Sequence, residues 1–100
     1  MSSEILLGPP IETEEQAKHW VIELTEQTET IRYACDLAIT VTDQRKAYIR
    51  WMIKRGESLG VLQALKRTGR LSDAAYTDLR SRILATQVPT VRDGVLPFGG

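Results

Sequence analysis

Two residues in this sequence could supply a nucleophile and a base, namely Cys35 and the single histidine, His19. Both fall in one predicted helix, where a separation of sixteen residues corresponds to about 24 Å along the axis. A thiol is activated only by a base within hydrogen-bonding distance, so the two cannot act as a pair. We therefore predict that Cys35 is a small core residue, that His19 is an exposed helix residue, and that no residue is catalytic.

Closely spaced carboxylates are the next candidates for chemistry. Glu14 with Glu15, and Glu23 with Glu26, could each be read as a pair that binds a metal ion. No histidine or further acid completes either ligand set, and a lone cysteine excludes a cysteine-based metal site. HExxH, GxSxG and glycine-rich phosphate-binding motifs do not occur in the sequence. We predict a solvated acidic face, with no metal, no cofactor and no enzymatic activity.

The charges are segregated along the chain, and this is the strongest functional signal. The net charge is zero, yet residues 1–31 hold seven acids and one base, whereas residues 44–70 hold eight bases and one acid. A local positive excess can bind an anionic partner or the acidic half of a neighbouring copy. The possible phosphate contacts are Arg45, Lys46, Arg50 and Lys54. Tyr48 and Trp51 could stack on bases, or they could be core residues beneath a salt-bridged surface.

A long amphipathic helix is predicted to carry most of these residues. Thr13 and Gln16 fit a capping box that begins it. A heptad-like apolar stripe follows, formed by Ala17, Trp20, Leu24, Ile31, Ala34, Ala38 and Val41. We favour a helix over about 13–55, continuous or merely kinked, because no Gly or Pro interrupts it before Gly56. It would be roughly 60 Å long and could not bury its stripe without partner chains.

A clean break near 40–43 is the alternative. Residues 39–42 are β-branched, and Thr42-Asp43 could cap a new helix. Beyond the predicted stop at Gly56, Ser58 could cap a short helix that ends at Gly69. Ser72 could then cap a last helix that ends near Gln87. The predicted fold class is therefore all-α, with a long helix followed by a short helical hairpin.

Extended arms are predicted at both ends of this helical domain. Residues 1–12 form an N-terminal arm, residues 13–87 the domain and residues 88–100 a C-terminal arm, because prolines and glycines exclude helix there. We predict that the C-terminal arm docks on a neighbouring subunit, although it could instead fold back near Tyr76 and Leu79. The predicted protein-interface residues are Trp20, Leu24, Ile31, Val95, Leu96 and Phe98.

Residues 61–84 resemble the short helical hairpins called SHOCT domains. The matching positions are Leu62, Leu65, Gly69, Leu71, Ser72, Asp73, Tyr76, Ile83 and Leu84. Ala74-Ala75 depart from the pattern, which usually has acids there. The layout of a helical core with apolar arms is also similar to small structural proteins of tailed-phage particles. The first resemblance implies an oligomerisation or docking hairpin, and neither implies catalysis.

Bulk composition narrows the class of protein. With 42% hydrophobic and 26% charged residues, the chain is typical of a globular protein. It has no apolar run long enough to span a membrane and no signal-peptide pattern, so we expect a cytoplasmic location or one within a virion assembled there. We predict a non-catalytic structural or assembly subunit that contacts itself or neighbouring protein subunits. The alternative is a small nucleic-acid-binding or regulatory protein that uses the basic residues 45–70.

Overall fold

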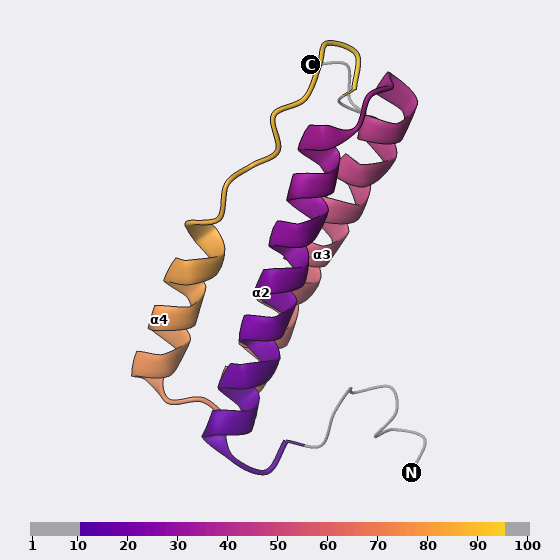
Figure 1. Ribbon diagram of the computed structural model, residues 1–100. Helices are drawn as coiled ribbons and strands as arrows, with labels where there is room; N and C mark the ends of the chain where they lie inside the picture. Colours follow the sequence, from indigo (N-terminus) through magenta and orange to yellow (C-terminus); the bar gives the residue numbers. More distant parts are fainter. Residues whose placement is uncertain (1–10, 96–100) are drawn as a thin grey trace.

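The computed structural model describes residues 11–95, and in this range the chain forms three helices and no strand. Helix α2 spans Glu14–Leu37, α3 spans Val41–Arg67 and α4 spans Asp73–Leu84 (Figure 1). The predicted all-α fold class is confirmed. Residues 1–10 of the predicted N-terminal arm and residues 96–100 of the C-terminal arm lie outside the described residues.

Helix α2 begins where the capping box predicts. The Thr13 hydroxyl accepts a hydrogen bond from the Gln16 backbone N–H at 3.1 Å, and the Gln16 side chain accepts from the Thr13 N–H, also at 3.1 Å. Two N–H groups that the first turn leaves without helical partners are thereby satisfied.

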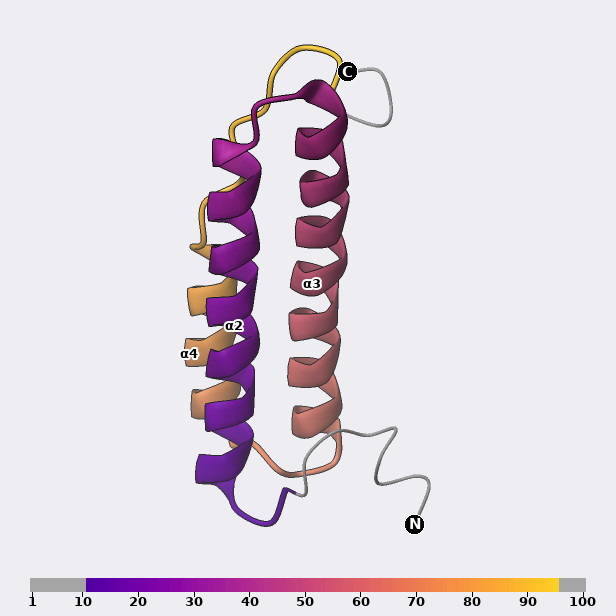
Figure 2. The same cartoon turned by 45° about the vertical axis from the view of Figure 1, so that its right-hand side comes forward.

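The prediction that the helix continues past residue 40 is wrong, because the chain reverses at residues 38–40. Ala38 and Thr40 adopt extended backbone conformations, and the Thr40 hydroxyl accepts from the Asp43 N–H at 3.1 Å to cap α3. The cap lies two residues before the Thr42 considered from sequence. The reversal places α3 antiparallel to α2 (Figure 2), so the apolar face of α2 is buried within one chain.

Helix α3 runs through Gly56 and Ser58, so the predicted stop and the predicted new helix start are both wrong. Gly56 has no positive φ, and the buried side chain of Ser58 donates to the Lys54 carbonyl at 2.9 Å. A mid-helix glycine costs about 1 kcal/mol. Burial of Leu62 and Leu65 further along α3 outweighs that cost. The helix ends before Gly69, whose φ of +77° closes the turn.

Helix α4 packs against α2 and α3 only at the end of the bundle opposite residues 38–40. Ser72 caps it as predicted, by accepting from the Ala75 N–H at 3.2 Å. The helix ends at Leu84, three residues before the predicted Gln87. The main core cluster lies between the three helices and comprises Ala17, Val21, Leu62, Leu65, Leu71, Ala75, Leu79 and Ile83.

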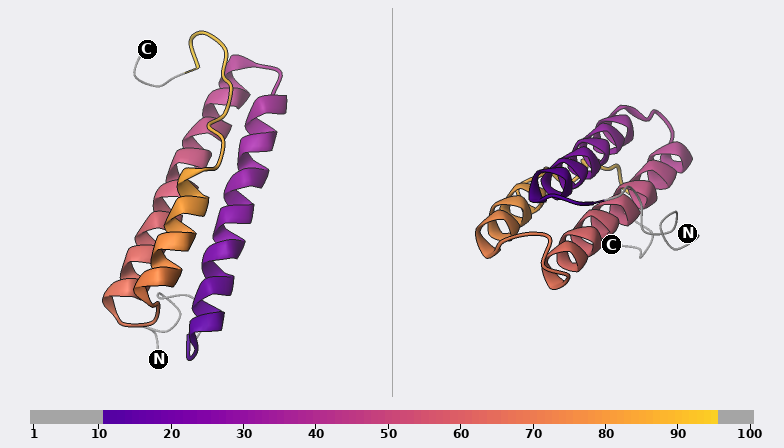
Figure 3. Two further views of the ribbon diagram at one scale, coloured as in Figure 1. Left: turned by 90° about the vertical axis from the view of Figure 1, so that its left-hand side faces the viewer. Right: turned by 90° about the horizontal axis from the view of Figure 1, so that it is seen from below.

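The bundle is consequently three helices wide at one end and two at the other. Seen side-on, α4 lies where α2 and α3 meet, and the segment after it continues along the same side toward residues 38–40 (Figure 3). We call the end that contains residues 38–40 the turn end. The radius of gyration is 15.4 Å, above the ~13 Å of a compact chain of this length, so much helix surface remains on the outside.

We expect Leu62→Ala to lower the free energy of unfolding by roughly 2–5 kcal/mol, because Leu62 is fully buried in the main cluster. Ile53→Ala on the same helix should change it by less than about 0.5 kcal/mol, because that side chain is 65% exposed. Urea unfolding of both variants measures the difference. Equal effects of the two substitutions would contradict the helix orientation described here.

Candidate interaction surface

The segment after α4 covers the side of the turn end that α4 does not reach. Its backbone is held by side chains from both long helices. The Thr90 N–H donates to the Asp36 carboxylate of α2 at 2.9 Å, and the Arg92 N–H donates to the Gln44 side-chain oxygen of α3 at 2.9 Å. We call residues 86–95 the strap, and its Pro89 and Val95 are buried.

Gln44 is the residue on which the strap converges. Only 2% of it is exposed, and its side-chain nitrogen donates to the Cys35 carbonyl at 3.0 Å and to the Thr90 carbonyl at 3.3 Å. With the bond from Arg92, the carboxamide joins α2, α3 and the strap. A buried carboxamide must find such partners, since an unsatisfied one is costly. Sequence reasoning did not identify Gln44, because its neighbours in space are distant in sequence.

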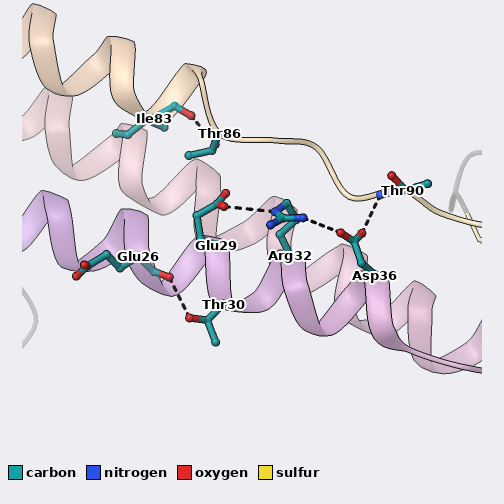
Figure 4. Close-up of polar contacts among 8 residues, drawn as sticks. All are labelled: Glu26, Glu29, Thr30, Arg32, Asp36, Ile83, Thr86 and Thr90. Carbon is teal, nitrogen blue, oxygen red and sulfur yellow. Dashed lines mark hydrogen bonds and ion pairs between the residues drawn. The ribbon is translucent and has the colours of Figure 1, made fainter.

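A line of charged side chains on α2 leads to the same strap. Figure 4 shows Arg32 between Glu29 and Asp36, at 3.4 Å and 2.6 Å respectively, with Asp36 also bonded to Thr90. The Arg32 side chain is 13% exposed, so the charges are only partly screened by solvent. This arrangement orients Asp36 toward the strap backbone.

The C-terminal residues that the structure describes therefore fold back on their own chain. Docking of the C-terminal arm on a neighbouring subunit stays a prediction, and within the chain residues 90–92 contact α2 and α3. This contact differs from the alternative contact near Tyr76 and Leu79, because the strap binds Asp36 and Gln44 instead. The predicted anchor residues Leu96 and Phe98 lie outside the described residues.

The predicted phosphate contacts do not form one free basic site. The Arg45 guanidinium donates to the carbonyls of Gly94 and Val95, the latter at 3.1 Å. Lys54 lies 3.6 Å from Glu57 in an ion pair, while Lys46 and Arg50 are exposed.

The aromatic residues of this segment are not arranged for base stacking. Trp51 is 3% exposed and belongs to the interior of the turn end. The Arg55 guanidinium lies over its ring, 5.3 Å from the centroid, and Tyr48 is half-buried beside it. The prediction that these aromatic residues belong to the core is therefore confirmed for Trp51.

Three of the four paired carboxylates contact other residues of the chain. Glu14 accepts from the Ser72 N–H at 2.6 Å, and this hydrogen bond lowers the pKa of the carboxyl below its ordinary value of 4.5. Glu15 pairs with Lys18 at 3.4 Å, and Glu23 lies 3.5 Å from the exposed His19. Among residues 11–95 no group of three or more potential ligands is close enough to hold a metal ion.

Cys35 is buried, as expected of a core residue. Its burial, and secondarily the Asp36 carboxylate, raise the pKa of the thiol. The thiol donates weakly to the Gln44 carbonyl at 3.5 Å. A buried neutral thiol in these surroundings is a poor nucleophile.

Of the predicted interface residues that the structure describes, two are buried and two are half-buried. Leu24 and Val95 are buried, so neither side chain is presented to a partner. Trp20 packs partly against the main cluster, and Ile31 is half-buried. The stripe read from sequence is therefore rotated: Val21, Thr28 and Cys35 face the interior, while Ala34 and Val41 are exposed.

Large apolar side chains are instead exposed near the turn end. They are Tyr33 and Leu37 in the last turns of α2, Ile39 in the turn that follows, and Ile49, Met52 and Ile53 in the first half of α3. Leu37 and Ile53 are 69% and 65% exposed. Single exposed apolar residues are ordinary, but a concentration at one end of a small protein is typical of a binding surface.

Comparison with known proteins adds nothing to this geometry. No family model, no curated protein and no solved structure matches the chain. The SHOCT and tailed-phage resemblances therefore stay predictions, although a turn does separate α3 from α4 at residues 68–72. None of the helices in the described part of the chain is long and apolar enough to cross a membrane.

We expect Gln44→Ala to destabilise the protein by about 1–3 kcal/mol, because it removes the hydrogen bonds of a buried side chain to α2 and to the strap. Gln63→Ala, an exposed position on the same helix, is the control and should have little effect. Hydrogen exchange at the Arg92 amide should also accelerate in Gln44→Ala. Unchanged exchange there would show that the carboxamide does not hold the strap.

Proposed function

We propose that this protein is a non-catalytic assembly subunit, which acts through contacts between its exposed helix faces and other protein chains. The larger complex would be a virion or a comparable particle. The observation that carries the proposal is the exposure of Tyr33, Leu37, Ile49 and Ile53 at the turn end. Burial of such side chains by a partner would contribute about 25 cal/mol per Å² of apolar surface.

The exposed apolar residues at the turn end are not the interface residues predicted from sequence, but they serve the same function, which is to bind other protein chains. Leu24 and Val95 stabilise the chain itself, whereas the segment 47–53 supplies apolar side chains both to the interior and to the surface. Trp51 faces inward, and Ile49 and Ile53 remain outside.

A protein partner fits these residues better than nucleic acid does. Binding to single strands relies on accessible aromatic rings beside free basic groups. Here Trp51 is buried and Arg45 is bonded to the strap. Exposed isoleucine and leucine side chains instead match the apolar centre of a protein interface.

Site-specific photo-crosslinking tests this proposal. A benzophenone amino acid placed at Leu37 or Ile53, in the cells that make the protein, should give covalent adducts with a protein. The control position is Arg80, exposed on α4, where few adducts are expected. Mass spectrometry of the adducts identifies what was reached. Adducts with nucleic acid alone, or none at either position, would contradict the proposal.

A further inference from the structure

The outer face of α2 changes in character along its length. Exposed residues that recur at helical spacing define it: Glu15, His19, Glu26, Tyr33 and Leu37. The first three are acidic or polar and lie far from the turn end. Tyr33 and Leu37 are apolar and lie near it.

The outer face of α3 changes in a matching way. It is defined by Ile49, Ile53, Gly56, Gly60, Ala64 and Arg67, all exposed. Starting from the turn end, the side chains on this face are first apolar, then small and finally basic. Thr28 lies 3.5 Å from Ser58, and Cys35 is bonded to Gln44, so the stretch of α2 between Thr28 and Cys35 runs beside the stretch of α3 between Gln44 and Ser58. Tyr33 is therefore level with the apolar part of α3, and the acids of α2 are level with its small and basic part.

We propose that the outer face of α2 in one copy binds the outer face of α3 in a second copy, with both copies in the same orientation. The contact sets apolar residues on apolar residues at the turn end. It sets the acidic half of α2 on the half of α3 that ends at Arg67. The inference rests on the proposed function and names the partner. Such a contact is heterologous, so each copy can bind one neighbour on either side and build a ring or a filament.

Charge favours the α2–α3 contact over either face paired in parallel with itself. Two α3 faces in parallel would set Arg67 against the same basic residue of the second copy. Two α2 faces together would juxtapose Glu15 and Glu26 with acids of the partner. Like charges placed opposite each other oppose association, whereas α2 on α3 pairs opposite signs.

Gly56 and Gly60 are consistent with close approach by a neighbouring helix. Within one chain a Cβ at either position would meet nothing within 4 Å. Neither glycine has a positive φ, so the monomer has no conformational need for them. A partner helix that packs directly over this part of α3 would require small residues at both positions.

Complementation between two single variants tests the proposal. Leu37→Asp disrupts the α2 face and leaves the α3 face intact, while Ile53→Asp does the reverse. Both side chains are largely exposed, so folding should be preserved. By light scattering, each variant alone should have the 11.2 kDa mass of one chain, and the wild-type mass should grow with concentration. An equimolar mixture should form a one-to-one heterodimer of about twice that mass.

A second variant separates association from folding. Gly60→Ala should raise the melting temperature by a few degrees through helix propensity, and should weaken self-association about tenfold or more. A variant that dimerises alone, a mixture that stays monomeric while the wild type associates, or a Gly60→Ala protein with undiminished association would overturn the proposal.

A monomeric wild type at all concentrations would also overturn this inference. If Leu37 and Ile53 nevertheless crosslink to a different protein in cells, the proposed function stands with another partner. If they give no protein adduct, both fail.

Discussion

The reversal at residues 38–40 is the constraint on which the rest of the structure depends. A continuous helix over this region would leave its apolar stripe in water, because a rod cannot bury one of its own faces. Extended conformations at Ala38 and Thr40, with the Thr40 hydroxyl capping α3, turn the chain back on itself. Each long helix then becomes the main partner of the other. Leu24 is therefore buried without a second chain. The surfaces left for a partner to bind are the outer faces of α2 and α3.

The unequal lengths of the helices determine what remains exposed. Helix α4 has 12 residues and reaches only part of the 24-residue α2, so it cannot cover the turn end. The strap completes that end on one side through Gln44 and Asp36. It adds hydrogen bonds and a buried Val95, but it leaves the outer sides of α2 and α3 uncovered. Leu37 and Ile53 are exposed on these outer sides.

Local signals allowed much of the fold to be predicted from the sequence. The capping box at Thr13, the cap at Ser72 and the stop at Gly69 depend on neighbouring residues, and all three were predicted correctly. Gly56 was predicted to end the helix because the low helix propensity of glycine is a local property. The burial of Leu62 and Leu65 that outweighs this cost depends on packing against other helices. Ser58 resembled a cap for the same reason, although it is buried inside α3.

The candidate surface was harder to predict than the fold. Trp20 and Ile31 were placed on the α2 stripe, but a modest rotation of the helix brings Thr28 and Cys35 inward instead. Periodicity defines a stripe only to within a fraction of a turn, and here a polar Thr28 paired with Ser58 lies inside. The roles of Gln44 and Arg45 depend on contacts with residues 90–95, which no local pattern reveals.

The central claim is that the outer faces of α2 and α3 are the binding surface of the protein. Backbone amide NMR spectra recorded across a dilution series test it most directly, because each residue reports separately. The account predicts concentration-dependent shifts or line broadening for residues 33–37 and 49–60, with residues 75–83 of α4 unchanged. Changes confined to α4, or to the shallow depression lined by Lys66 and Tyr76, would contradict it.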